Sequence, residues 1–488
     1  MIKFDIRKIR TRWDTLVVIC LLLVFSGWRT ITLQNRSLDS DEIFSILFSQ
    51  RFHYNLLNTH NPFDDGNPPL HFVIVKFFNQ VLGLHAELVR LSSVIFYFLS
   101  GYYVYLLSKH FLGNQAIKNI FAVLFFLSSS LIFFYAGNNR PYSLLVLTSL
   151  ATFYYQATYF FTPHRAYTVL LLSIIACTVG FYTHYSFTIF FAFLWLSLLV
   201  FIRSKQKLLK TVQIVLPPLL LYSPWIIRFG LSQLYPKTHG AGAPYYLWQK
   251  SLPALSFTRW MSVVFNFSEG NYVHSLIIAI LLILLLSIVT FKIVKREKYS
   301  QQKLFFHLFL CVSLILFFMT PLYKTLTIPR YSIFLIPFIY LSLSTFVRFS
   351  KSFVLSVPLV CIVFIFFIRG TTRLDTPHED WRGLAQYLSA HSLVAGKTVI
   401  IADQYYLVPV IRFYYTGSAV IGCLKEFDES SECKISKDEI STYLHINYVQ
   451  APWTYPYTGM LENDNIVQKD SRHFASIVLF ELTNKSVK

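Results

Sequence analysis

The chain has 488 residues, of which 55% are hydrophobic and 18% aromatic, whereas only 14% are charged. Apolar runs of about 18 to 22 residues, long enough to cross a bilayer, recur through the first three quarters of the sequence. This composition excludes an ordinary soluble globular protein and predicts a polytopic α-helical membrane protein. The formal net charge of +19 does not indicate a nucleic-acid partner, because most Lys and Arg residues lie in short loops between the apolar runs.

The amino terminus combines a basic segment, MIKFDIRKIRTRWD, with an apolar run from Leu16 to Leu33. This order of charged and apolar residues is typical of a signal peptide. The run is long for that role, however, and no small-x-small cleavage motif follows it. We therefore predict an uncleaved first span whose amino terminus lies in the cytoplasm.

Later apolar runs bring the number of predicted spans to eleven. They cover residues 89–108, 118–135, 143–161, 167–183, 186–202, 211–227, 274–292, 304–320, 331–347 and 353–368. With this assignment the basic loops, such as RSKQKLLK, all lie on the cytoplasmic side, as the positive-inside rule requires. An odd number of spans then places the carboxyl-terminal region outside the cytoplasm.

Two other segments are predicted on the outer side. Residues 69–84 are apolar but short and contain Lys76, so we expect a helix that lies along the outer membrane interface. Residues 228–272 form a long segment rich in aromatic and turn residues, and a loop of this length is usually functional.

The composition changes after residue 370. DWRGLAQYLSAH at 380–391 predicts a helix, KTVIIAD at 397–403 predicts a strand, and YLVPVIRFYY and SIVLFEL each predict a further helix or strand. We therefore expect a transmembrane domain at 1–369, with its catalytic first external loop at 35–88, and a small extracytoplasmic α/β domain at 370–488. Cys423 and Cys433 lie in that domain, where a disulfide between them is possible.

Three carboxylates follow the first span in the stretch SLDSDEIFS: Asp39, Asp41 and Glu42. Acidic residues at such a position often cap a helix, and Ser40 to Glu42 before the apolar IFSILF fits a helix start. The alternative is a catalytic role, because a carboxylate beside a substrate hydroxyl can remove its proton. The residues alone leave both interpretations open, as well as the choice between Asp39 and Asp41.

Basic and histidine side chains are predicted on the same outer side, against the usual bias of Lys and Arg toward the cytoplasm. They are His71, Arg140, His184, Lys324 and Arg330. The two arginines each neighbour a proline and a tyrosine, in NRPY and PRY, and a guanidinium suits a multidentate grip on a phosphate. Snorkelling of either arginine to the lipid headgroups is the alternative.

Together these stretches resemble the GT-C polyprenyl-phosphate-sugar glycosyltransferases, in particular the family 39-like enzymes, the lipid A aminoarabinose transferases and the protein O-mannosyltransferases. The shared features occur in the family order. They are the Asp41–Glu42 pair, PPL at Pro68–Leu70, RPY at Arg140–Tyr142, PRY at Pro329–Tyr331 and DWR at Asp380–Arg382. The sequence departs from the family at Asn67, where relatives have His or Lys, and at Asn138 and Asn139, where some relatives have an Asp.

The resemblance implies an inverting glycosyltransferase that moves a hexosyl or pentosyl group from a polyprenyl-phosphate sugar to a hydroxyl of a lipid, glycan or protein. It places the general base on Asp41, with Glu42 as the second catalytic residue. Arg140, Lys324 and Arg330 are expected to stabilise the leaving phosphate. The remaining predicted substrate-binding residues are Asn67, His71, Tyr142, His184 and Tyr331.

The same resemblance implies an integral protein of a bacterial-type inner or plasma membrane, with its active site on the extracytoplasmic face. We expect no redox cofactor, and Asp41 with Glu42 would be a thin ligand set for a divalent metal. The alternative function is a transporter or flippase of lipid-linked sugars, and a noncatalytic scaffold is a third. Against a transporter, the sequence has no repeated halves and no mid-span acids for ion coupling.

Overall fold

The computed structural model describes residues 6–51, 68–83, 86–161, 167–227, 301–319, 329–344, 379–390, 398–402, 407–417, 419–422, 442–448, 466–474 and 477–484. They fall into two compact units. The helical unit comprises Met1–Leu33, Phe52–Leu84 and Val89–Leu374, and the α/β unit comprises Gln34–Arg51, His85–Leu88 and Asp375–Lys488. Asn67, Lys324, Cys423, Cys433, the segment 228–272 and the predicted spans 274–292 and 353–368 lie outside the described residues.

The described part of the helical unit consists mainly of α-helices. They are α1 (Ile6–Ile31), α3 (Leu70–Leu82), α4 (Leu91–Leu112), α5 (Ala116–Leu127), α6 (Ser130–Ala136), α7 (Tyr142–Phe161), α8 (Tyr167–Phe181), α9 (Ser186–Leu199), α10 (Lys205–Trp225), α15 (Gln301–Met319) and α16 (Ile336–Ser344). Short 3₁₀ helices, η1 (Thr32–Asn35), η2 (Ala86–Arg90) and η5 (Pro329–Leu335), adjoin α1, α4 and α16.

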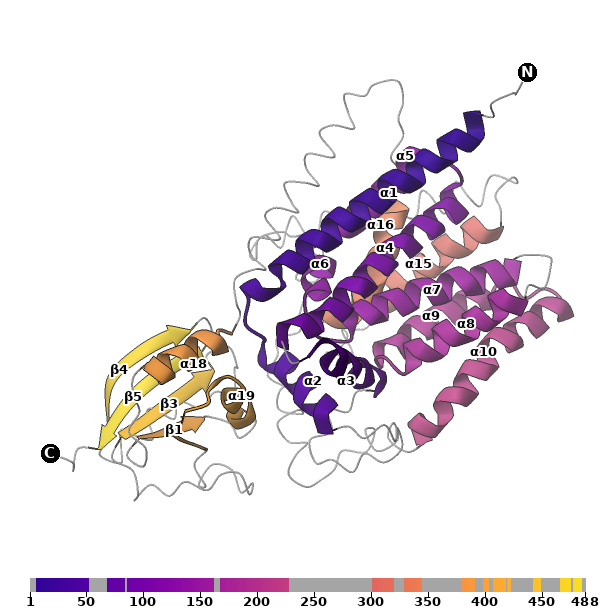
Figure 1. Cartoon of the computed structure of the whole chain (residues 1–488). Coiled ribbons are helices and arrows are strands. Elements are labelled where there is room, and N and C mark those ends of the chain that lie inside the picture. Colours follow the sequence, from indigo (N-terminus) through magenta and orange to yellow (C-terminus); the bar gives the residue numbers. More distant parts are fainter. Residues whose placement is uncertain are drawn as a thin grey trace. The chain divides into compact units, whose positions relative to one another are not determined.

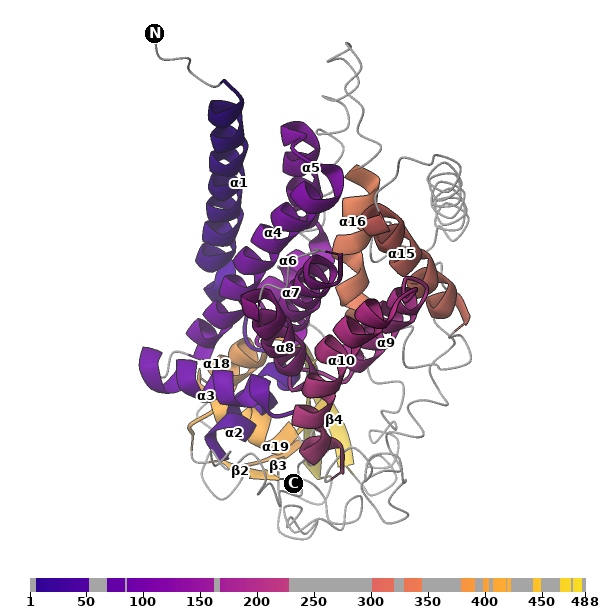
Figure 2. The same cartoon turned by 90° about the vertical axis from the view of Figure 1, so that its right-hand side faces the viewer.

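Helix α7 occupies the middle of this unit. Helices α1, α4 and α5 pack against one another on one side of it, and α8 and α10 pack together on the other (Figures 1 and 2). Helix α15 contacts α9, and α16 contacts α5, so these later helices pack against helices from earlier in the chain. The 3₁₀ helix η5 contacts α6, α7 and α9, which brings the PRY motif among the ends of those helices.

Two helices of the described part of the chain are long and apolar enough to cross a membrane, Trp13–Asn35 and Glu87–Leu112. They correspond to the first two predicted spans. The described helices also include shorter apolar ones, among them Tyr167–Phe181 and Ser186–Leu199. The total of eleven spans stays a prediction. Helix α3, expected along the interface, has 13 residues.

The predicted span at 118–135 is not one continuous helix. It is two helices, α5 and α6, bent by 63° at a break of a few residues. Ser129 is extended there, with φ −67° and ψ 117°, and begins α6 as its N-cap residue. Serine hydroxyls compete for backbone hydrogen bonds, and Ser128 Oγ donates to the Phe125 carbonyl at 3.3 Å. An apolar stretch that looks continuous in sequence is therefore interrupted by its serines.

Helix α10 also differs from the prediction, because it begins at Lys205 rather than at residue 211. The hydroxyl of Ser204 accepts a hydrogen bond from Lys207 N at 3.3 Å, so it caps the helix start. Residues 205–210 of the basic run RSKQKLLK, which was expected in a loop, thus form the start of the helix.

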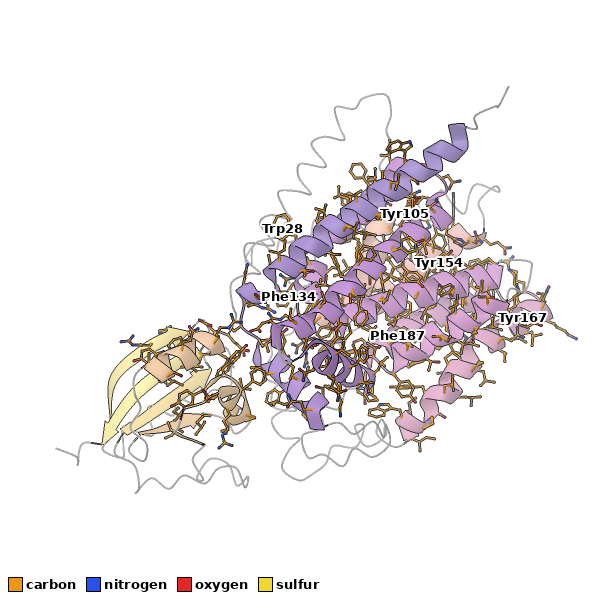
Figure 3. All side chains as sticks on the ribbon, in the orientation of Figure 1. Trp28, Tyr105, Phe134, Tyr154, Tyr167 and Phe187 are labelled. Carbon is orange, nitrogen blue, oxygen red and sulfur yellow. The ribbon has the colours of Figure 1, made fainter. Side chains whose placement is uncertain are left out.

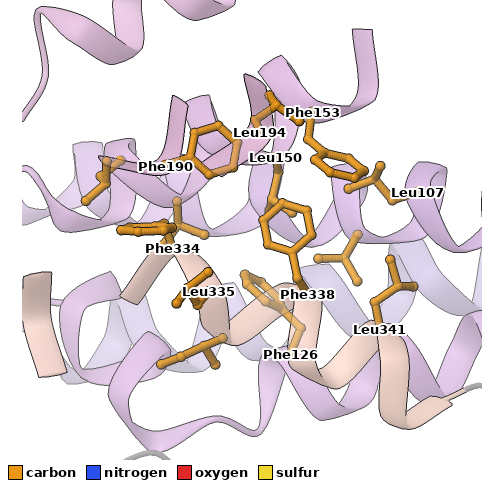
Figure 4. Close-up of a cluster of buried hydrophobic side chains, with 14 of the residues drawn as sticks. Leu107, Phe126, Leu150, Phe153, Phe190, Leu194, Phe334, Leu335, Phe338 and Leu341 are labelled. Carbon is orange, nitrogen blue, oxygen red and sulfur yellow. The ribbon is translucent and has the colours of Figure 1, made fainter. Parts of the chain in front are cut away.

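Aromatic rings fill the core of the helical unit. The ring of Phe153 on α7 lies 4.9 Å from Phe309 on α15 and 4.9 Å from Phe338 on α16, between ring centroids. Phe190 on α9 meets the same group (Figure 4). Lipid tails are as apolar as these rings, so close packing rather than exclusion of water favours this assembly. Figure 3 shows the aromatic side chains of the unit, with Tyr167 exposed and Phe187 buried.

The α/β unit has a mixed five-stranded sheet in the order β2-β1-β3-β5-β4. Its strands are β1 (Thr398–Ala402), β2 (Val420–Gly422), β3 (Thr442–Tyr448), β4 (Ile466–Phe474) and β5 (Ile477–Asn484). β1 pairs in parallel with β2 and β3, whereas β5 pairs antiparallel with β3 and β4. The strand predicted at KTVIIAD is confirmed as β1. SIVLFEL, for which either a helix or a strand was predicted, forms the strand β5.

Within the described residues of this unit, the sheet is accompanied by three helices: α2 (Ser40–Arg51), α18 (Trp381–Ala390) and α19 (Leu407–Tyr414). Helices α18 and α19 contact each other, and they reach β4 and β2, the two edges of the sheet (Figure 1). Helix α2, which follows the first span in the sequence, packs against α19. Two pieces of the predicted first external loop, 34–51 and 85–88, thus group with the carboxyl-terminal residues.

Candidate active site

Helix α2 begins at the acidic stretch singled out in the sequence, and Asp39 is its N-cap residue. Asp39 Oδ1 accepts a hydrogen bond from Glu42 N at 2.8 Å, while Asp39 N donates to Glu42 Oε2 at 3.1 Å. This reciprocal pair is a capping box, which satisfies two backbone donors at the helix start. The helix predicted to start at Ser40 is therefore confirmed, with its cap one residue earlier.

The carboxylate of Glu42 is fully buried and pairs with Arg36. Their Nη2 and Oε2 atoms lie 3.4 Å apart, and the side chains are 6% and 0% exposed. Glu42 is therefore held on one side by the backbone of Asp39 and on the other by a buried guanidinium. The neighbouring Asp41 is only partly buried, and its backbone carbonyl accepts a hydrogen bond from Ser45 Oγ at 3.0 Å.

Burial and the neighbouring charges both change the pKa of Asp39. Burial, followed by the negative charge of Glu42, raises the pKa of Asp39 from its ordinary value of 3.8 to about 7. Glu379 and Asp41 act in the same direction, and the positive charge of Arg36 opposes them. Near neutral pH, Asp39 is therefore populated in both its protonated and its ionised form.

The cations and histidines predicted on the outer side meet in the helical unit. His71, on the first turn of α3, is buried, and its Nε2 lies 3.2 Å from the carbonyl oxygen of Asn139. A carbonyl can only accept, so Nε2 carries the proton. Burial lowers the pKa of His71 to about 3, and the neighbouring charge of Arg140 contributes in the same direction. His71 is therefore neutral at physiological pH.

His184 lies in the turn between α8 and α9, within an aromatic group. Its ring stacks on Tyr331 with 5.7 Å between centroids, and Tyr142 lies 5.5 Å away. His184 Nδ1 accepts a hydrogen bond from Ser186 N at 3.0 Å. The guanidinium of Arg330 lies 5.2 Å from the Tyr331 ring centre, and its Nη2 donates to the Tyr331 hydroxyl at 3.4 Å.

The positive charge of this group comes from its two arginines. Burial, together with the smaller effects of the charges of Arg140 and Arg330, lowers the pKa of His184 to about 3. His184 is therefore neutral, like His71. The two histidines are buried, whereas Arg140 and Arg330 are partly exposed. A partly exposed guanidinium backed by neutral rings is suited to hold an anionic group such as a phosphate.

The structure thus gathers six of the predicted residues into one group of the helical unit, which we call the arginine cluster: His71, Arg140, Tyr142, His184, Arg330 and Tyr331. Asp41 and Glu42 belong to the α/β unit. Within the described ranges, no three His, Cys, Asp or Glu side chains gather in a way that could hold a metal ion.

Sequence reasoning missed two residues that contact the acidic stretch, both from the α/β unit. Glu379 accepts a hydrogen bond from Ser40 N at 2.8 Å, and the hydroxyl of Tyr414 accepts one from Leu38 N at 2.9 Å. Glu379 immediately precedes the DWR motif. Its place beside that motif was the feature of the sequence that could have indicated its role.

Comparisons with known proteins agree with this architecture. Residues 66–227 match the model of the family described as dolichyl-phosphate-mannose-protein mannosyltransferase. The matched range contains His71, Arg140, Tyr142 and His184 of the arginine cluster. The comparison with curated proteins finds no match.

Among solved structures, the apo oligosaccharyltransferase of Archaeoglobus fulgidus is 11% identical, with a TM-score of 0.53 over 84% of this chain and 64% of that one. Its complex with zinc and sulfate is 11% identical, with a TM-score of 0.52 over 88% and 67%. ArnT from Cupriavidus metallidurans bound to undecaprenyl phosphate is 13% identical, with a TM-score of 0.48 over 96% and 98%.

These relationships, together with helices long and apolar enough to cross a bilayer, identify an integral membrane protein. Over residues 66–227 the chain matches the dolichyl-phosphate-mannose-protein mannosyltransferase family model, and it shares its fold with the Archaeoglobus fulgidus oligosaccharyltransferase.

Proposed function

We propose that the protein is an inverting glycosyltransferase, which moves a sugar from a polyprenyl-phosphate donor to an acceptor hydroxyl on the extracytoplasmic face of the membrane. The observation that carries the proposal is the arginine cluster, in which Arg140 and Arg330 are the charged members and both histidines are neutral. The family match over residues 66–227 supports a donor of this class.

The leaving group explains why two arginines would be needed. As the bond between the anomeric carbon and the phosphate oxygen breaks, the bonding electrons pass to that oxygen, and polyprenyl phosphate leaves as a dianion. Positive charge already in place stabilises this developing charge without reorganisation during the step. In this proposal Arg140 and Arg330 receive the phosphate, and Lys324 is a further candidate. The tyrosine ring beneath Arg330 limits where its guanidinium can lie.

The acceptor oxygen forms the new bond to the anomeric carbon from the opposite side, so the configuration inverts. Its proton passes to a carboxylate, for which we propose Asp41. Asp39 and Glu42 are already bonded to each other at the start of α2. Asp41 follows the N-cap by two residues, and its side chain takes no part in that capping pair.

The remaining predicted groups take supporting roles. His71, Tyr142, His184 and Tyr331 would shape the sugar and phosphate pocket, and Asn67 would contribute an uncharged amide. The sugar would be a hexose or a pentose, and the acceptor a lipid, a glycan or a protein. The reaction as written needs no redox cofactor, since no atom changes oxidation state overall.

The proposal is tested by mass spectrometry of surface glycolipids, glycans and glycoproteins from three kinds of cell. They carry the wild-type protein, the Asp41→Asn variant or the Asp39→Asn variant, at equal membrane abundance. The expected result is a species lighter by one sugar in Asp41→Asn cells only. That mass difference would identify both the sugar and the acceptor.

A purified preparation separates the enzyme from a transporter. Wild-type protein in detergent, given a polyprenyl-phosphate sugar and an acceptor extract, should release polyprenyl phosphate, and Asp41→Asn should not. A protein that moves the intact glycolipid across liposomes without cleaving it would instead be the transporter or flippase named as the alternative.

A further inference from the structure

We propose that Glu379 is a positioning residue, which holds the segment carrying the general base in place from the α/β unit. The inference rests on the proposed role of Asp41 as base. Glu379 lies about 340 positions after Asp41 in the chain. Its carboxylate accepts hydrogen bonds from both the backbone amide and the hydroxyl of Ser40, the residue before Asp41.

The contacts between Glu379 and the acidic stretch use every oxygen that Glu379 has. Oε2 accepts from Ser40 N at 2.8 Å, Oε1 accepts from Ser40 Oγ at 3.2 Å, and the backbone carbonyl accepts from Ser37 Oγ at 2.6 Å. The amide of Ser40 is one of the donors that a helix leaves without an internal partner at its start. A charged acceptor at that point also interacts favourably with the helix dipole.

A second contact fixes the same stretch two residues earlier. The amide of Leu38 donates to the hydroxyl of Tyr414 at 2.9 Å, and Leu38 is fully buried. Tyr414 ends α19, the helix against which α2 packs. The backbone before Asp41 is therefore held at Leu38 and at Ser40 by two different elements of the α/β unit.

Glu379 is itself held by the residues that follow it. The indole Nε1 of Trp381, which is 2% exposed, donates to Glu379 Oε2 at 2.5 Å. Asp380 caps α18 by accepting from Gly383 N at 2.9 Å. A Cβ atom at Gly383 would lie 2.2 Å from Asp380 Oδ2, so a larger residue at this position would displace the capping carboxylate.

Arg382 completes the motif. Its Nη1 donates to the carbonyl of Gln34 at 3.2 Å, and its Nη2 pairs with Glu87. The sequence EDWRG at 379–383 therefore contacts the segment that follows the first span at three points, Gln34, Ser37 and Ser40. This gives a physical role to a motif that the glycosyl-transfer step does not itself use.

Such an arrangement matters because general-base catalysis depends on placement. A displacement of about 1 Å caused by a distant change can reduce turnover about 10²-fold. Donor binding in the proposed function depends on the arginine cluster instead. Loss of the Glu379 contacts should therefore lower kcat and leave the donor KM nearly unchanged, whereas general unfolding would reduce the amount of active protein.

The test uses the full-length protein in detergent, as wild type, Glu379→Gln and Arg412→Gln. Gln keeps the shape of Glu379 but loses its charge and one acceptor oxygen. Arg412 donates to the Ile421 carbonyl at 2.9 Å within the same unit and serves as the matched control. Measurements are kcat, the donor KM, and hydrogen exchange of peptides that cover residues 37–45.

The expected result for Glu379→Gln is a kcat about 10- to 100-fold lower, a donor KM within about twofold of wild type, and faster exchange at 37–45. Arg412→Gln should leave kcat and that exchange near wild type. A Glu379→Gln variant with normal kcat and normal exchange would overturn the positioning role.

Asp41→Asn in the same assay separates the two proposals. An inactive Asp41→Asn beside a fully active Glu379→Gln overturns the positioning role alone. A fully active Asp41→Asn overturns the base assignment, and the positioning role is then overturned with it.

Discussion

Asp39 and Glu42 bond to each other in both directions at the start of α2. Asp39 Oδ1 accepts from Glu42 N at 2.8 Å, and Asp39 N donates to Glu42 Oε2 at 3.1 Å. Of the three carboxylates in SLDSDEIFS, these two therefore help to form the helix start. The structure gives the acidic stretch a folding role, and the proposed chemical role rests on Asp41, which lies between them.

The first prediction separates these two roles. Asp41→Asn should lower kcat by about 10²- to 10⁴-fold, the usual contribution of a general base. Asp39→Asn is the matched control, because Asn caps a helix about as well as Asp and should retain most of the activity. Both are measured as initial rates of polyprenyl phosphate release from purified protein.

The opposite pattern would be equally informative. If Asp39→Asn abolished turnover and Asp41→Asn did not, the base would be Asp39, whose pKa near 7 also suits proton transfer at neutral pH.

The second prediction concerns the buried pair between Arg36 and Glu42. Glu42→Ala leaves the Arg36 guanidinium buried without its carboxylate, which should cost about 3–5 kcal/mol in the free energy of unfolding. The double variant Arg36→Met/Glu42→Leu removes both charges and should recover most of that loss. Thermal unfolding in detergent measures both.

A mainly catalytic Glu42 would behave differently. Glu42→Gln would then lower kcat about as much as Asp41→Asn, with no change in the unfolding temperature.

The third prediction concerns pH. Because burial and neighbouring acids raise the pKa of Asp39 from 3.8 to about 7, the folded state binds its proton more tightly than the unfolded state. The contribution of Asp39 to stability therefore falls as pH rises from about 4 to about 7 and stays low above that. Asp39→Asn should be more stable than wild type at pH 8, with the difference shrinking toward pH 4.

The measurement is the difference in unfolding temperature between the two proteins at each pH. A difference is needed because His71 and His184, whose pKa values are lowered to about 3, contribute the opposite slope below pH 6.5 in both proteins. A difference that did not vary with pH would contradict the raised pKa of Asp39.

The fourth prediction concerns the arginine cluster. Arg330→Lys keeps the charge but loses the planar fork and its place over the Tyr331 ring. We expect kcat to fall by about 10²-fold, because the developing phosphate charge loses a preorganised donor. Tyr331→Phe is the control, since it removes only the 3.4 Å contact with the hydroxyl and should have a much smaller effect. Equal activity of Arg330→Lys and wild type would remove Arg330 from the phosphate site.

Much of the fold could be predicted from local sequence. The apolar length of the stretch at 91–112 and the alternation at 398–402 specify a helix and a strand, because each pattern matches the period of one structure. The helix start at SLDSDE follows from the spacing of Asp39 and Glu42, which is a local capping signal. The arginines at RPY and PRY could be selected because their chemistry suits a phosphate.

Other features depend on contacts between residues far apart in the chain, which no local pattern contains. The break at Ser128 and Ser129, the neutral state of His184 and the contact of Glu379 with Ser40 are of this kind. The sequence by itself determined which residue types follow the first span and which segments are apolar. Only the tertiary structure decided that the acidic stretch joins the α/β unit, because the hydrogen bonds that bind it there connect residues about 340 positions apart.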